Sequence, residues 1–125
     1  MRLFHVWMHV LINQYKLESS DFKMAFKLRF VQKIDQAKKD EFLEIERKFI
    51  AFEKANPHMP QGRRFLPVSG KEPTNTLIWE CEFETLEAVT TQLQAIYDHP
   101  EHEILLQQQI PYMQDSFTEI YEVLT

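Results

Sequence analysis

Arg29 and Glu80 are the first two residues whose types and positions could carry chemistry. Arg29 lies in an alternating stretch at 26–34 and Glu80 in a second one at 76–84, so we expect both on strands and on one face of a sheet. On an enclosed face an arginine could hold a carboxylate or an enolate, and a desolvated glutamate could act as a general base. A structural ion pair uses the same residue types, and we favour that interpretation.

Two adjacent arginines, Arg63 and Arg64, follow Gly62 and form a candidate anion-binding corner. Arginines at the edge of a loop are commonly exposed without a ligand, and we favour this simpler explanation. Glu82 lies two residues after Glu80 and is therefore expected on the same face of the strand. Tyr112 is an aromatic residue suited to lining a pocket. These residues complete the candidate ligand-binding set.

Two histidines, His99 and His102, stand on either side of Pro100 at an expected helix junction. They could act as general bases or as ligands, although a helix cap or a surface position explains them more simply. His5 and His9 lie four apart but have no third ligand nearby. No P-loop, dinucleotide fingerprint, serine-hydrolase elbow or zinc spacing occurs, so we expect neither a metal nor a cofactor.

The composition fits one globular domain. The chain has 125 residues, of which 44% are hydrophobic, and ten phenylalanines supply much of the expected core. Cys81 is the single cysteine and falls on an apolar face, so it is predicted to be inert core. A chain that cannot form an intrachain disulfide is compatible with a reducing compartment, and we expect a cytoplasmic location.

Charge is distributed unevenly along the chain. All 14 lysines and arginines lie between Arg2 and Lys71, whereas 11 acidic residues and no basic ones follow from Glu72 onward. A clustered basic face would suggest nucleic-acid binding. Because the basic residues are scattered, we predict instead that the two halves neutralise each other in the fold and that no nucleic acid binds.

The periodicity predicts the order β-α-β-β-α-β. Strands are expected at 26–34, 63–68, 76–84 and 117–124, a first helix at about 38–55, and a second helix that follows Thr85, is interrupted at 98–101 and ends near Pro111. This order is typical of the ferredoxin-like α+β fold, a four-stranded antiparallel sheet with two helices on one face. In the expected strand order, the first strand lies between the third and the fourth.

The other face of such a sheet must be solvated or covered by a partner. It collects Lys27, Arg29, Val31 and Lys33 from the first strand beside Ile78, Glu80 and Glu82 from the third, with either Glu119 or Glu122 from the last. Exposed cross-strand ion pairs contribute roughly 0.2–1 kcal/mol each. Two interpretations stay open: a solvated face with modest ion pairs, or a polar cavity enclosed between two sheets.

The chain resembles the dimeric α/β-barrel superfamily, and within it the NIPSNAP-like members. The resemblance covers roughly 27–124 and rests on the strand order and on three segments: 75–83 (NTLIWECEF), 98–101 (DHPE) and 119–124 (EIYEVL). It implies a homodimer whose two sheets pack face to face around a central cavity. Members of the superfamily include cofactor-independent oxygenases, haem-degrading enzymes, lactone isomerases and dehydratases, and fold alone selects none of these reactions.

Residues 1–23 precede the family pattern. Apolar residues recur there at helical spacing, but the run Leu3–Ile12 is too short to cross a bilayer. The segment is interpreted as a peripheral helix, a weak targeting segment or an extension that the fold does not need. We place the domain at 24–125 and expect no stable membrane insertion.

Three hypotheses for function follow. The first is a homodimer that binds a small apolar or acidic molecule in the cavity between the sheets. The second is a cofactor-independent monooxygenase or isomerase that uses Arg29 and Glu80. The third is a protein-interaction module.

Overall fold

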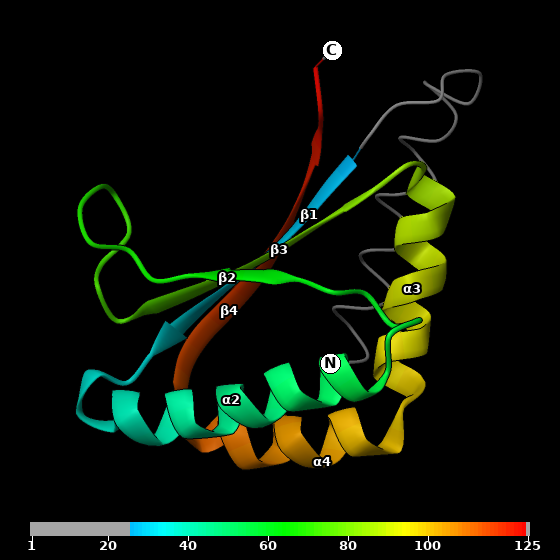
Figure 1. Ribbon diagram of the computed structural model, residues 1–125. Helices are drawn as coiled ribbons and strands as arrows, with labels where there is room; N and C mark the ends of the chain where they lie inside the picture. The colour runs from blue at the N-terminus through cyan, green and yellow to red at the C-terminus, as the bar shows by residue number, and fades with distance from the viewer. Residues whose placement is uncertain (1–25, 125) are drawn as a thin grey trace.

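The computed structural model describes residues 26–124, which form one four-stranded sheet with helices on one side (Figure 1). The strands are β1 (Phe26–Ile34), β2 (Arg63–Phe65), β3 (Thr76–Phe83) and β4 (Met113–Glu122), and the helices are η1 (Gln36–Lys38), α2 (Lys39–Ala55), α3 (Leu86–Asp98), α4 (Pro100–Gln109) and η2 (Ile110–Tyr112). The spatial strand order is β2-β3-β1-β4, and every pair is antiparallel. The predicted ferredoxin-like fold is confirmed, with β1 between the third and the fourth strand. The expectations for residues 1–23 and for the domain start at Met24 lie outside this range.

Several strand boundaries differ from the predicted ones, and two of the differences are larger than two residues. β2 ends at Phe65 and not at residue 68, because Pro67 has no N–H to continue a ladder. β4 begins at Met113, four residues earlier than expected, because η2 closes at Tyr112 and the Asp35 N–H donates to the Tyr112 carbonyl at 2.9 Å. The predicted interruption at 98–101 is confirmed, because α3 ends at Asp98 and α4 begins at Pro100.

Helix ends follow local side-chain chemistry. Asp35 accepts a hydrogen bond from the Ala37 N–H at 3.1 Å, and Thr85 caps α3 by accepting from the Ala88 N–H at 3.0 Å. His99 accepts from the Glu101 N–H at 3.2 Å, and Pro100 follows at the first helical position. The chain therefore breaks between α3 and α4 and runs back along α2, so that α2 and α4 lie side by side (Figure 1).

The core lies between the helices and one face of the sheet. One cluster packs the sheet against α3, and its buried residues are Phe26, Leu28, Trp79, Leu86, Val89 and Leu93. A second cluster joins α2, the following loop, α3 and α4, and consists of Ile45, Phe49, Phe52, Met59, Ile96, Leu105 and Leu106. Ile45, Phe49 and Phe52 form an apolar stripe along α2, and this stripe and Trp79 of β3 are buried in the two clusters. No helix in the described range is long and apolar enough to cross a membrane.

The opposite face of the sheet, here called the open face, is organised in cross-strand rows. The register places Phe65, Ile78, Val31 and Phe117 side by side in an apolar row. The neighbouring row is charged and alternates in sign, with Arg63, Glu80, Arg29 and Glu119. Lys27 and Arg29 approach Glu80 at 3.3 and 3.4 Å, and Arg29 approaches Glu119 at 3.4 Å. Glu119 is therefore the acidic residue that the last strand contributes beside Arg29.

Candidate ligand-binding site

A cavity of about 300 Å³ lies between the helices and the sheet. Most of its wall is aromatic or aliphatic. Six ring side chains from β1, α2, β3, α3 and α4 line it: Phe30, Phe49, Phe52, Trp79, Tyr97 and His102. Phe117 of β4 also contributes to the lining. Ile110 and Ser116 also line it and are exposed, so the mouth lies between η2 and β4. This size and lining are typical of small-molecule sites, whose volumes start at about 300 Å³.

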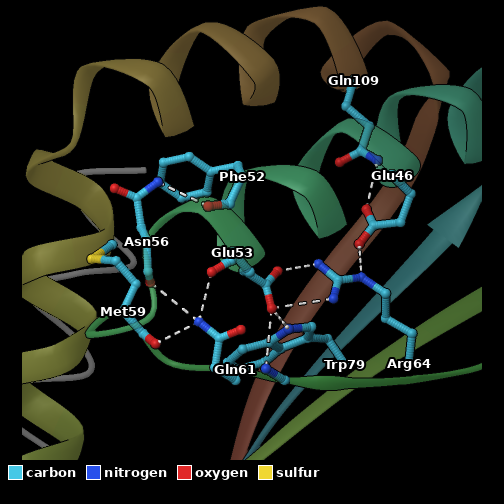
Figure 2. Close-up of polar contacts among 10 residues, drawn as sticks. Glu46, Phe52, Glu53, Asn56, Met59, Gln61, Arg64, Trp79 and Gln109 are labelled. Carbon is cyan, nitrogen blue, oxygen red and sulfur yellow. Dashed lines mark hydrogen bonds and ion pairs between the residues drawn. The ribbon is translucent and has the colours of Figure 1, made fainter.

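One side of the cavity is a buried ionic cluster, in which Arg64 of β2 reaches two glutamates of α2 (Figure 2). The Arg64 Nε donates to Glu46 at 2.5 Å, and its two terminal nitrogens donate to both carboxylate oxygens of Glu53. The second oxygen of Glu46 accepts from the Gln109 amide of α4 at 2.9 Å. The cluster therefore joins an edge strand to two helices.

The loop before β2 completes the shell around Glu53. The Gly62 N–H donates to Glu53 Oε1 at 3.1 Å, and the indole N–H of Trp79 lies 3.5 Å from the same oxygen. A side chain at position 62 would overlap the indole ring, so only glycine allows the backbone to pass this close. The Gln61 amide donates to carbonyl oxygens of Glu53, Asn56 and Met59 and so fixes the loop (Figure 2).

The charges of this cluster satisfy one another. Burial alone would lower the pKa of Arg64, but hydrogen bonds and charges from Glu53 and Glu46 outweigh burial, and the pKa is raised. The side chains of Arg64, Glu46 and Glu53 are only 14%, 8% and 13% exposed. One cation against two anions leaves the cluster with a net charge of −1, and all four carboxylate oxygens accept hydrogen bonds.

His102 and Tyr97 form an uncharged part of the wall. Burial lowers the pKa of His102 to about 4, against smaller opposing effects of Glu103 and Glu53, and His99 lowers it further. The ring packs against Phe49 at a centroid distance of 5.2 Å and against Tyr97 at 6.1 Å. Burial also raises the pKa of Tyr97 to about 12. Both side chains are therefore neutral at neutral pH.

Solved structures with the same fold include NIPSNAP proteins. An uncharacterized NIPSNAP-like domain protein from Burkholderia xenovorans matches with a TM-score of 0.68 at 17% identity, over 83% of this chain and 89% of that one. A dimeric protein of unknown function with a ferredoxin-like fold from Bacteroides fragilis has a TM-score of 0.60 at 16% identity, over 79% and 96%. A candidate antibiotic biosynthesis monooxygenase from Caulobacter crescentus has a TM-score of 0.64 at 14% identity, over 87% of this chain and 98% of that one.

These likenesses confirm the predicted similarity to NIPSNAP proteins at the level of the fold. At such identities they carry no activity over to this chain. No protein-family model matches the sequence, and no curated protein matches it.

Three predicted site residues meet on the open face. Arg29, Glu80 and Glu82 line an open depression of about 500 Å³ together with Lys27, Tyr121, Glu122 and Val123. Glu80 is engaged by both neighbouring cations, and Arg29 also reaches Glu119. The depression lies on the side of the sheet away from the helices, so these residues are separated by the sheet from the aromatic cavity.

The other predicted site residues are dispersed. Arg63 and Arg64 alternate along β2, so Arg63 lies on the open face in register with Glu80, and the two do not form one anion-binding corner. Tyr112 packs beside the core clusters and is not among the cavity-lining residues. His99 is the cap of α4 and meets the edge of Phe52 at 4.7 Å. Among residues 26–124, no group of three potential ligands could hold a metal ion.

Sequence reasoning missed Glu46 and Glu53. Their signal was present, because each lies three or four residues from Phe49 and therefore on the apolar stripe of α2. An acidic residue at such a position needs a buried cation. Cys81 is half-buried, and burial and then the charges of Glu53 and Glu82 raise the pKa of its thiol, as suits an unreactive position.

Replacing the buried cation should destabilise the protein strongly. Arg64→Met leaves Glu46 and Glu53 buried without a counter-charge, so we expect the free energy of unfolding to fall by about 3–5 kcal/mol. The control is Arg47→Met on the exposed side of α2, away from the open face, where only an ion pair with Glu44 is lost, about 0.5 kcal/mol or less. Urea denaturation measures both, and equal losses would contradict the buried ionic cluster.

The pH dependence of stability should reveal His102. Since its pKa lies near 4 in the folded chain and near 6.5 when unfolded, the unfolded chain binds the extra proton first as pH falls. The stability present above pH 6.5 is thus lost toward pH 4, by roughly 3 kcal/mol. His102→Phe should remove that part of the slope in denaturation curves, whereas His58→Gln in the exposed loop should retain it. Identical slopes for the native chain and His102→Phe would refute the assignment.

Proposed function

We propose that this protein binds a small, predominantly apolar molecule in the cavity between its helices and sheet. The observation that carries the proposal is an open-mouthed cavity of about 300 Å³ whose wall gathers six ring side chains from five elements. Aromatic side chains each offer a large apolar area and favour flat apolar ligands. The cavity's charged side chains bind one another, so apolar contact supplies most of the affinity.

The location differs from the sequence-based hypothesis, which placed a ligand between two sheets. On the open face Lys27 and Arg29 are paired with Glu80, and the depression there is more open to solvent and is lined mostly by charged side chains. An apolar molecule loses more contact with water in the aromatic cavity than in that depression. We therefore assign the apolar ligand to the helix side of the sheet.

Blocking the mouth tests this proposal. Ser116→Trp places a bulky ring at the exposed edge of the cavity, while Gln108→Trp places the same ring on an exposed position of α4. Naphthalene should bind the native chain and Gln108→Trp alike, and Ser116→Trp should lower the affinity by about tenfold or more, because the ring competes for the entrance. Isothermal titration measures the affinities, and unchanged binding by Ser116→Trp would place the ligand elsewhere.

We infer further that two copies pair through the open face. Support comes from the apolar row across four strands, in which Phe65 remains 38% exposed, and from the alternating charges beside it. When two copies pair about a two-fold axis, a row of alternating positive and negative side chains on one copy can face the same row on the other with opposite charges in contact. A similar fold is described as dimeric in the Bacteroides fragilis protein.

Light scattering tests the pairing. Phe117→Arg introduces a charge into the apolar row and should convert the dimer into monomers, because an unpaired charge is costly to bury. Ile104→Arg is the matched control, since Ile104 is 59% exposed on α4 and away from the sheet. A native chain that is monomeric, or a Phe117→Arg variant that remains dimeric, would contradict this interface.

A cofactor-independent enzyme that uses Arg29 and Glu80 is the second candidate, supported by their shared depression. We favour the structural role, in which Glu80→Gln lowers the free energy of unfolding by about 1 kcal/mol or less and leaves naphthalene binding unchanged. Glu82→Gln, exposed on the same strand, is the control. The enzyme would be supported instead if the native chain and Glu82→Gln consumed oxygen in the presence of a bound compound, and a correctly folded Glu80→Gln variant did not.

A further inference from the structure

The polar groups that the cavity offers to a ligand are all uncharged. The charged side chains in its wall are Glu46, Glu53 and Arg64, and these are joined to one another. His102 and Tyr97 are neutral at neutral pH for the reasons given above. These two rings, of which His102 has a buried Nδ1 without a hydrogen-bond partner in the described range, are uncharged polar groups of the wall. The other uncharged polar groups form a strip of hydroxyl and amide groups on the sheet.

This strip comes from β1 and β4. Thr118 lies opposite Phe30, and Ser116 lies opposite Gln32, all on the helix side of the sheet. Thr118 is only 8% exposed, and its hydroxyl makes no hydrogen bond within the described range. The hydroxyl oxygen is nevertheless not one of the unpartnered side-chain atoms that are fully buried in the protein. Since Thr118 lines the cavity and its hydroxyl is neither hydrogen-bonded nor sealed by the protein, we infer that the hydroxyl is open to the cavity space. It is a buried donor and acceptor available to a ligand.

A carboxylate would meet poor conditions here. It would have to shed its water of hydration in a space whose one cation is already engaged by two glutamates. The cluster beside it carries a net charge of −1, which adds repulsion. A ligand hydroxyl, in contrast, both donates and accepts and can pair with the threonine hydroxyl in either direction.

We propose that the cavity selects uncharged aromatic molecules carrying one hydroxyl group, which hydrogen-bonds Thr118, and rejects carboxylates of the same size. This inference rests on the proposed function of the cavity. It also narrows the ligand class, because it assigns no acidic ligand to this cavity.

Three probes of nearly equal shape test the selection: naphthalene, 2-naphthol and 2-naphthoate, titrated calorimetrically into the full chain at neutral pH. We expect 2-naphthol to bind about tenfold more tightly than naphthalene, because it satisfies a buried hydroxyl. We expect 2-naphthoate to bind at least about tenfold more weakly than naphthalene. Thr118→Val should bring 2-naphthol to within about twofold of naphthalene while naphthalene itself still binds.

Thr76→Val is the matched control, because Thr76 is buried on the open face and does not line the cavity. It should leave all three affinities unchanged. If naphthalene and 2-naphthol bind equally to the native chain, or 2-naphthoate binds as well as they do, the selection is overturned while the cavity remains a binding site. If none of the three binds, the proposed function fails and this inference fails with it.

Discussion

The buried contact of Arg64 with Glu46 and Glu53 is the interaction on which the arrangement of the cavity depends. β2 is three residues long and pairs with β3 alone, so backbone hydrogen bonds hold it weakly. The guanidinium binds two glutamates that lie about two turns apart on α2, and Gln109 links the cluster to α4. A buried charge cluster is stable only when complete, which forces the strand, the loop at Gly62 and both helices into one geometry.

That geometry explains why a cavity remains between layers that otherwise pack closely. The break at His99-Pro100 returns α4 along α2, so that Phe49, Phe52 and His102 meet around one space. The ionic cluster of Arg64, Glu46 and Glu53 occupies one wall, so apolar side chains cannot move in from that side to fill the space. On the sheet, Phe30 stacks on Trp79 at 5.2 Å, while the small side chains of Ser116 and Thr118 leave room beside them. The space is thus bounded by rings and by a short strip of hydroxyl groups.

Much of the fold was predictable from local patterns. Alternation fixed β1 and β3, Asp35 and Thr85 marked helix starts, and the order of elements implied the strand order and the charged open face. The site was less accessible, because it depends on which distant residues meet. Arg64 looked like an exposed loop arginine until β2 placed it opposite α2, and His102 looked like a surface residue until α4 folded back. Glu46 and Glu53 could have been found, since acidic residues on an apolar helix stripe require a partner; the hydroxyl of Thr118 could not, because its role depends on empty space beside it.

Mapping the bound probe by NMR tests the central claim most directly. The backbone amide and side-chain signals of isotopically labelled full-length protein are followed during titration with 2-naphthol. We expect shifts for the Trp79 indole N–H, the His102 ring and the Thr118 amide and methyl group, whereas the signals of Lys27, Glu80 and Glu82 should not move. Shifts concentrated on the open-face residues, with the Trp79 and His102 signals unmoved, would contradict the claim.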